Sequence, residues 1–145
     1  MGLPGRVLVA LVAALGAVSI GACGDDDEGT GTTRPLVTFG RTADDGKTYG
    51  LVVEQGRGAT VTQYPAKPKR FTVDEGELSS LRDALVDLNI RALKHDYQPS
   101  QPTAVGDRYS LTYQGTTVQA AERAQLPEKL ESVIDKLDEI LDGQT

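Results

Sequence analysis

The chain has 145 residues, of which 39% are hydrophobic and 25% are charged, values that fit one ordinary small domain with appendages. A single cysteine excludes an intramolecular disulfide, and one cysteine with one histidine cannot build a zinc site from these residue types. The formal net charge of −6 lacks the basic footprint of a nucleic-acid-binding protein, so nucleic acid is not an expected partner.

Residues 1–22 are predicted to be a signal peptide. Arg6 supplies a short basic start, and the stretch from Val7 to Ile20 then contains no charged side chain. Such a run is typical of the apolar region of a signal peptide. Because a membrane-spanning helix needs about 20 apolar residues, the pattern favours a signal peptide over a transmembrane helix.

Cys23 follows this segment directly. A plain secretory cleavage before Cys23 would place Ile20 at the third position from the cut, where a small residue is required. Ile20-Gly21-Ala22-Cys23 instead resembles the bacterial lipobox, in which an aliphatic residue and two small ones precede a cysteine. The resemblance implies cleavage before Cys23 and a diacylglycerol, with acyl chains such as palmitate, on its thiol. We therefore expect an extracytoplasmic protein that is anchored to the bacterial cell membrane by lipid, since two acyl chains hold stably.

Residues 23–34 are predicted to form the lipidated cysteine and an acidic flexible tether. The stretch GDDDEGTGTTR has no apolar residue, so it cannot bury enough surface to order itself. A flexible chain of this length has a root-mean-square span of about 5 to 6 Å times the square root of 11, or roughly 18 Å. The acids lack the glycine and glutamate positions of an EF-hand loop, so no metal site is expected.

From Leu36 the chain is predicted to form an antiparallel meander. Four short runs rich in Val, Thr, Tyr or Phe are separated by glycine: LVTFGR, TYGLVVEQ, GATVTQY and KRFTV. Gly56-Arg57-Gly58 is expected to supply the positive φ of a tight turn. Gly46-Lys47-Thr48 matches the last residues of a phosphate-binding loop. The spacing between Gly40 and Gly46 does not match that motif, however, and a strand follows where the motif has a helix. No nucleotide site is therefore expected, and Asp45-Gly46 is predicted to be a turn.

Two amphipathic helices are predicted. The first begins with Asp74 as its N-cap, has Glu77 at capping-box spacing, and carries leucines at 78, 81, 85 and 88. The second starts at Pro127 and ends at Gly143, with its acidic residues opposite an apolar stripe. Between the helices, RYSLTY and TTVQAA flank Gln114-Gly115 and predict a hairpin in which Leu111 faces Val118.

The predicted fold class is α+β, with a small antiparallel sheet in the order β-β-β-β-α-β-β-α and two amphipathic helices packed on one face. A single domain is expected over residues 35–145. The segment from His95 to Asp107 contains two prolines and is expected to be a long loop, the kind of segment that often carries function.

The sequence contains no recognisable catalytic set. His95 precedes Asp96, but neighbours on the chain do not ordinarily hold the geometry of a base and its orienting group, so a solvated histidine is favoured. The common hydrolase, metalloprotease and dinucleotide motifs are absent. We therefore expect a protein that is not an enzyme and has no cofactor. Lys67, Lys69 and Arg70 lie among prolines, where they would either contact anionic lipid or protect a sheet edge.

Five stretches between about Leu36 and Leu141 carry a family resemblance. They are LVVEQGRGATVT, FTVDEGELSSLRDALVDL, the proline-bearing loop after Tyr97, DRYSLTYQGTTVQ and LPEKLESVIDKLDEIL. Their succession resembles the emfourin-like family of small bacterial proteins, whose namesake inhibits thermolysin-like metalloproteases. The resemblance implies a secreted or surface protease as the partner.

Two functions remain open. The first is a lipid-anchored extracytoplasmic protein-binding module that inhibits thermolysin-like metalloproteases. The alternative is a structural or small-ligand-binding envelope lipoprotein without inhibitory activity. An inhibitor needs a preorganised exposed loop, which prolines favour, whereas a ligand pocket usually needs aromatic walls that this chain can hardly build. The candidate binding loop consists of Tyr97, Gln98, Pro99, Ser100, Gln101 and Pro102, and the second candidate surface of Asp44, Asp45 and Gly46.

Overall fold

The computed structural model describes residues 34–101 and 106–145. The predicted signal peptide, Cys23 and the acidic run lie outside the described residues, as does Pro102 of the candidate loop. The described residues belong to one compact unit. Within the described ranges, no helix is long and apolar enough to cross a membrane.

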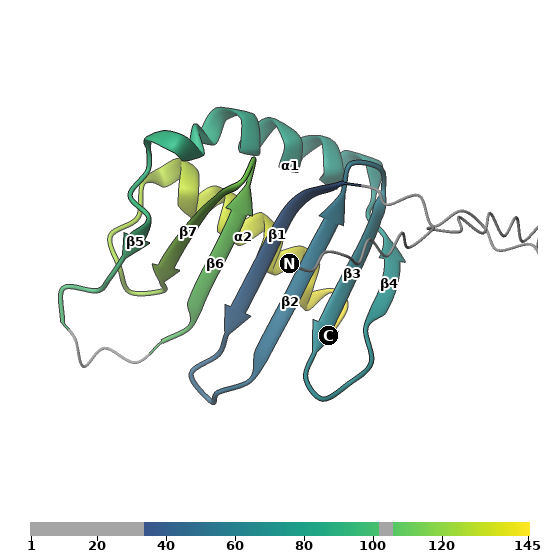
Figure 1. The fold of residues 1–145 in the computed structure, drawn as a ribbon, viewed down its shortest axis with the longest axis horizontal. Coiled ribbons are helices and arrows are strands. Elements are labelled where there is room, and N and C mark those ends of the chain that lie inside the picture. The colour runs from purple at the N-terminus through teal and green to yellow at the C-terminus, as the bar shows by residue number, and fades with distance from the viewer. Residues whose placement is uncertain (1–33, 102–105) are drawn as a thin grey trace, which may run out of the picture. The chain divides into compact units, whose positions relative to one another are not determined.

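Seven strands form one sheet, which is accompanied by two α-helices and a short 3-10 helix in the described part of the chain (Figure 1). The elements in chain order are β1 (Pro35–Thr42), β2 (Thr48–Glu54), β3 (Gly58–Gln63), β4 (Lys69–Thr72), α1 (Glu75–Leu88), η1 (Ile90–Ala92), β5 (Asp96–Tyr97), β6 (Arg108–Tyr113), β7 (Thr116–Ala121) and α2 (Glu128–Asp142). The strand order across the sheet is β4-β3-β2-β1-β6-β7-β5, and all neighbours are antiparallel except β5 and β7. The predicted α+β class with a mostly antiparallel sheet is confirmed.

The predicted element order was wrong in the segment between the helices. The long loop expected from His95 to Asp107 begins with β5, which pairs in parallel with β7 through Asp96 opposite Gln119 and Tyr97 opposite Ala120. Tyr97 is half-buried against the core, and its hydroxyl accepts a hydrogen bond from the backbone N–H of Lys94 at 3.2 Å. A two-residue strand has too few positions to show an alternating pattern, so it forms only because the edge of β7 offers backbone partners.

The core lies between the sheet and the two helices. Alternate residues of the central strands point to one face, and the register aligns them in rows, so that Phe39 pairs with Leu51 on one side and Leu111 on the other. Figure 1 shows α1 and α2 on this same side of the sheet. The leucines of α1 and the apolar stripe of α2 complete the core, and no polar or charged side chain of the described residues is buried. The opposite face of the sheet carries small or polar residues such as Thr38 and Thr112.

The predicted hairpin between β6 and β7 is confirmed. Tyr113 pairs with Thr116, and Leu111 pairs with Val118, as the sequence pattern requires. Gln114 and Gly115 have φ values of 49° and 76°. Positive φ at both central residues gives a turn whose twist matches that of the flanking strands.

The turn between β2 and β3 joins the expected strands but by a different backbone geometry. Among the described glycines only Gly46 and Gly115 have positive φ, so the expectation of positive φ in the Gly56-Arg57-Gly58 turn was wrong. At Gly58, a Cβ would lie 2.6 Å from the Glu54 carboxylate, so a larger residue there would require the end of that side chain to move. The turn at Asp45-Gly46 has the predicted character, with Gly46 at a φ of 84°.

The start of α1 is capped as predicted. The Asp74 carboxylate accepts hydrogen bonds from the backbone N–H groups of Gly76 at 2.8 Å and Glu77 at 3.4 Å. These contacts satisfy two of the N–H groups that have no partner within the helix. The second helix begins after Pro127, which occupies its N-cap position.

Candidate functional site

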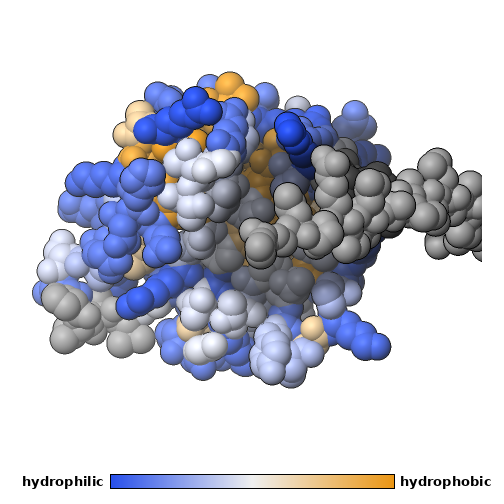
Figure 2. All heavy atoms as spheres, in the orientation of Figure 1, coloured by the Kyte–Doolittle hydropathy of each residue, from blue (hydrophilic) through white to orange (hydrophobic). Residues whose placement is uncertain are grey.

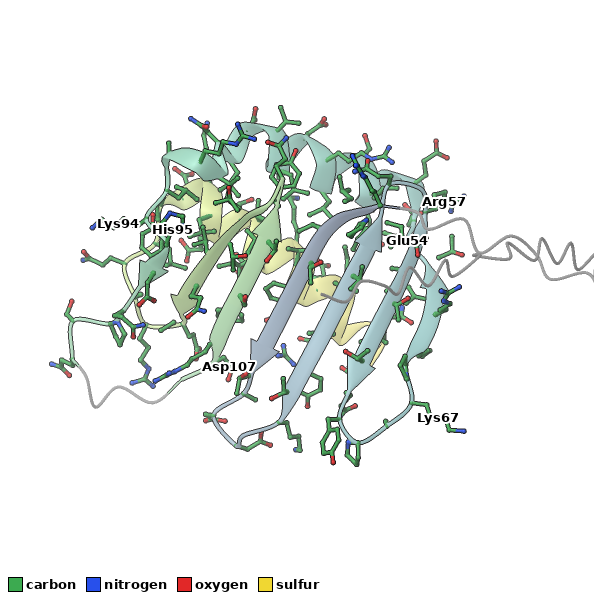
Figure 3. The ribbon with its side chains drawn as sticks, viewed as in Figure 1. Glu54, Arg57, Lys67, Lys94, His95 and Asp107 are labelled. Carbon is green, nitrogen blue, oxygen red and sulfur yellow. The ribbon has the colours of Figure 1, made fainter. Side chains whose placement is uncertain are left out.

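The two ends of the sheet differ in which segments of the chain lie there. Arg34 precedes β1 at one end, and the turn after Thr42 lies at the other. Because β1 has eight residues, these ends are roughly 27 Å apart at about 3.4 Å per residue. We call the end with Arg34 and the turns 55–57 and 114–115 the tether end. Figure 3 labels Glu54 and Arg57 there.

The opposite end, which we call the distal end, gathers four connections. The strand registers place four connecting segments at this end of the sheet: residues 43–47, 64–68, 98–101 with 106–107, and 122–127. Figure 3 shows Asp107 and Lys67 at this end. The distal end is therefore the part of the described domain farthest along β1 from the point where residues 1–33 join it.

Both candidate surfaces border Asp107 at the distal end. The backbone N–H of Asp44 donates a hydrogen bond to Asp107 Oδ1 at 3.2 Å, across 63 positions of sequence. Asp107 also lines a cleft of about 320 Å³ together with Gln98 and Pro99 of the candidate loop. The sequence treated the loop and the hairpin tip as separate surfaces, whereas the fold makes them neighbours.

The members of the candidate loop are not equivalent. Tyr97 is part of β5 and half-buried, so it supports the loop rather than projecting from it. The Gln98 amide donates hydrogen bonds to both carboxylate oxygens of Asp96, at 2.7 and 3.0 Å. Ser100 and Gln101 are exposed, and so is Gln98, while Pro99 is partly buried. The projecting part of the described loop is therefore the segment 98–101.

At the hairpin tip, Asp45 acts within its own turn. Its carboxylate accepts a hydrogen bond from the backbone N–H of Lys47 at 3.0 Å and forms an ion pair with Lys47 Nζ at 2.7 Å. The hydrogen bond from the Lys47 side chain is the main cause that lowers the pKa of Asp45 below its usual value. Asp44 and Gly46 are exposed beside it. Of the two tip carboxylates, only that of Asp44 is free of hydrogen bonds to described residues.

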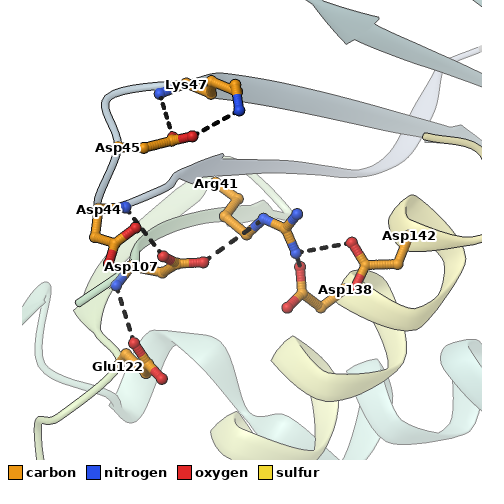
Figure 4. Close-up of polar contacts among 8 residues, drawn as sticks. All are labelled: Arg41, Asp44, Asp45, Lys47, Asp107, Glu122, Asp138 and Asp142. Atoms are coloured by element: carbon orange, nitrogen blue, oxygen red, sulfur yellow. Dashed lines mark hydrogen bonds and ion pairs between the residues drawn. The ribbon is translucent and has the colours of Figure 1, made fainter.

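An ion cluster fixes the distal end to α2 (Figure 4). Arg41 Nη1 lies 2.6 Å from Asp138 Oδ1 and 2.9 Å from Asp142 Oδ1, and Arg41 Nε lies 3.8 Å from Asp107 Oδ2. The guanidinium carbon also sits 4.9 Å from the centroid of the Tyr49 ring. One arginine thus connects β1, the first residue before β6, and the last turns of α2.

This cluster is more buried than a surface salt bridge. The Arg41 side chain is 13% exposed and that of Asp138 is 24% exposed. Burial would lower the pKa of Arg41, but attraction and hydrogen bonding from Asp138, followed by Asp142, raise it above its ordinary value. Burial also raises the pKa of Asp138, and the nearby arginine offsets only part of that effect. The charged groups of Arg41 and Asp138 are therefore held in a partly desolvated site.

The ion pairs of Arg41 were not predicted from the sequence. Val37, Phe39 and Arg41 alternate on β1, so the pattern itself puts Arg41 on the core face at the end of the strand. The acidic residues of α2 were expected opposite the apolar stripe, but Asp138 and Asp142 lie beside it and contact Arg41. An arginine in an inward-facing strand position was the available signal for a buried charge partner.

Tyr109 lies beside the cluster but has no acid–base role in it. Its ring stacks on Phe39 with centroids 5.9 Å apart. Burial, followed by the charges of Asp138 and Asp107, raises the pKa of Tyr109 to about 12. The hydroxyl therefore stays protonated at neutral pH.

The remaining expected groups are dispersed. Lys69 pairs with Val61 on the core side of the sheet, and Arg70 pairs with Thr60 on the opposite face. The Lys69 Nζ donates a hydrogen bond to the Gln144 carbonyl at 3.4 Å. Both belong to β4, which is the edge strand of the sheet. His95 Nδ1 lies 3.2 Å from the Thr117 carbonyl, so the histidine covers the other edge beside β5. In residues 34–101 and 106–145, no group of three or more His, Cys, Asp or Glu side chains could hold a metal ion.

No protein-family model matches the chain, and no curated protein matches it.

Proposed function

We propose that this protein is a lipid-anchored extracytoplasmic module that binds another protein through its distal end, and that this partner is a thermolysin-like metalloprotease which it inhibits. The observation that carries the proposal is that Asp107 links the two candidate surfaces, because its carboxylate accepts from the Asp44 N–H and it lines one cleft with Gln98 and Pro99. A single contiguous surface at the distal end suits a protein partner better than two isolated loops.

The proposed anchor supports this orientation. If Cys23 is acylated, the membrane attachment reaches the domain through Arg34, at the tether end. A flexible tether with a span of roughly 18 Å would then hold the domain near the membrane. The distal end lies about one strand length away from Arg34, so attachment through Arg34 would leave it free to contact a partner.

The distal end also has the rigidity that a binding surface needs. Pro99 restricts the backbone of the projecting segment, and the Arg41 cluster fixes the adjacent start of β6 to β1 and α2. A preorganised surface loses less conformational entropy on docking. The resemblance of the sequence to the emfourin-like family supports a protease as the partner, and it remains the basis for that part of the proposal.

The test is an inhibition assay with residues 31–145, the compact unit that contains the whole described core. We expect this domain to inhibit at least one thermolysin-like metalloprotease at micromolar concentration. Gln98→Ser combined with Pro99→Gly should weaken inhibition, because the projecting segment loses its side chain and its restraint. Gln55→Ser at the tether end is the matched control and should leave inhibition unchanged.

The outcomes separate the parts of the proposal. If the intact domain inhibits none of the proteases, or is digested as a substrate, the inhibitor function is wrong and the envelope-lipoprotein alternative replaces it. If the Gln55→Ser control weakens inhibition and the loop variant does not, the binding surface has been assigned to the wrong end.

A further inference from the structure

The cleft at the distal end has a rigid floor. The backbone N–H of Asp107 donates to Glu122 Oε2 at 3.0 Å, and the N–H of Glu122 donates to the Asp107 carbonyl at 2.9 Å. A Cβ at Gly106 would lie 2.8 Å from Glu122 Oε2 and would displace that carboxylate. The connection before β6 and the one after β7 are thus joined by reciprocal hydrogen bonds.

Each acidic side chain of the cleft has one carboxylate oxygen that accepts a backbone hydrogen bond within the protein. Glu122 Oε2 accepts from the Asp107 N–H, while Asp107 Oδ1 accepts from the Asp44 N–H and Oδ2 faces Arg41 Nε at 3.8 Å. These contacts maintain the shape of the distal end. They also direct the acidic oxygens toward backbone N–H groups and Arg41.

The two basic side chains of the cleft have no such contacts. Arg108 at the start of β6 and Arg123 after β7 both line the cleft, and neither forms an ion pair or a side-chain hydrogen bond with the described residues. The same holds for other exposed cations of the described residues, such as Arg91 and Lys94, but Arg108 and Arg123 differ from these in lining one cleft together. Two arginine side chains that have no partner among the described residues therefore border one cleft whose frame is held by hydrogen bonds.

From this arrangement we infer that the cleft binds a carboxylate of an acidic peptide segment in the partner protein, with the guanidinium groups of Arg108 and Arg123 as donors. A guanidinium group presents a planar set of N–H donors that matches a carboxylate in a bidentate geometry. Pro99 and Ala121 add apolar surface along which the peptide chain can lie. The inference takes from the proposed function that the partner is a protein, and it adds the chemistry by which that partner is recognised.

The cleft holds two arginines and two acids, so its formal charge is zero before a ligand enters. A phosphorylated side chain, which carries about −1.5 to −2, would be attracted more by the arginines and repelled more by the acids than a carboxylate, so a titration with inorganic phosphate distinguishes the two oxyanions. The volume of about 320 Å³ suits a side chain with part of its backbone.

Nuclear magnetic resonance titration of residues 31–145 tests the inference without any protease. The probes are the peptide acetyl-Leu-Glu-Glu-Leu-amide and its neutral counterpart acetyl-Leu-Gln-Gln-Leu-amide. We expect the acidic peptide to shift the amide signals of Gly106, Arg108 and Arg123, and the neutral peptide to bind much more weakly. Replacing both arginines (Arg108→Gln with Arg123→Gln) should weaken binding of the acidic peptide about tenfold or more, since a charge-assisted contact is worth roughly that factor.

Arg91→Gln is the matched control, because Arg91 is exposed in η1 and does not line the cleft. It should leave binding unchanged, and the thermal unfolding of each variant shows whether the fold is retained. Equal binding of both peptides, equal loss in the control, or no shift in the cleft would overturn the inference. Inorganic phosphate that binds as tightly as the acidic peptide would replace it with a general oxyanion site. Failure of the protease assay with a positive titration would reject the protease and keep the carboxylate site.

Discussion

At the scale of single residues, Arg41 is the side chain on which most of the distal end depends. It is the cation that faces Asp107, Asp138 and Asp142, and it comes from a strand position that the alternating pattern assigns to the core. A charge in a partly buried site is tolerated only when partners surround it. The ion pairs of the cluster therefore connect β1, the start of β6 and α2.

The raised pKa of Asp138 predicts how the free energy of unfolding depends on pH. The folded-state pKa lies above the ordinary value because burial penalises the charged carboxylate, so between the two values the folded state binds more protons than the unfolded state. The free energy of unfolding should therefore decrease as the pH rises through that window. Asp138→Asn, whose amide oxygen still accepts from Arg41, should remove this contribution.

The measurement is denaturant unfolding of both proteins at pH 7 and at about pH 4. The Asp138→Asn variant is expected to gain stability relative to the native chain at the higher pH. Asp135→Asn, which removes an exposed aspartate from the same helix, controls for the loss of one negative charge. A relative stability of the Asp138→Asn variant that increases on acidification would contradict the assignment.

At the scale of elements, turns decide which strands meet and with which register. The β6–β7 hairpin has its two positive φ values at Gln114 and Gly115, whereas the β2–β3 turn has none at its glycines. Positive φ was expected at Gly56-Arg57-Gly58, because glycine in a short connection is compatible with it. The difference comes from the connection itself, since the Gly58 position is restricted by the Glu54 side chain and not by its dihedral angle.

This contrast predicts different costs for two glycine-to-alanine substitutions. Gly115→Ala should lower the free energy of unfolding by about 1 kcal/mol or more, because an L-residue is strained at a φ of 76°. Gly56→Ala should be nearly neutral, since its φ is not positive and a Cβ there would meet nothing within 4 Å. Equilibrium unfolding in urea measures both. Equal costs at the two positions would show that the φ of Gly115 does not matter.

At the scale of the whole molecule, the arrangement separates the point of attachment from the candidate binding surface. The chain enters the sheet at Arg34 in a central strand, and the cleft, the hairpin tip and the Arg41 cluster lie at the other end of that strand. Most of the described surface visible in Figure 2 is hydrophilic or intermediate. Tyr64 and Val86 are the large hydrophobic side chains that are mostly exposed in the described ranges.

The proposed anchor leads to a prediction for the intact protein in a bacterial cell. Cys23→Ser should move the protein from the membrane fraction to the soluble fraction or leave it with its signal peptide, because a serine cannot carry the thioether-linked lipid. Thr32→Ser, outside the lipobox, should leave both localisation and processing unchanged. Fractionation and mass spectrometry measure the outcome, and membrane attachment with normal processing in the Cys23→Ser variant would refute lipidation.

The sequence alone was sufficient for features that depend on local pattern. The leucine spacing of α1, the Asp74 cap and the Gln114-Gly115 hairpin are each determined within a few residues, because helix periodicity, capping and turn geometry are short-range effects. The α+β class follows from these elements taken together.

Only the tertiary structure decided which distant residues meet. The pairing of β5 with β7 depends on a free sheet edge, and the contact of Asp44 with Asp107 depends on the register of β1 with β6. The Arg41 cluster requires the last turns of α2 to cross that same strand end. The sequence by itself therefore determined the two α-helices, the strands other than β5, the core pattern and the expectation of an anchor. The candidate site was decided by long-range packing, because its hydrogen bonds and ion pairs join segments that no local pattern relates.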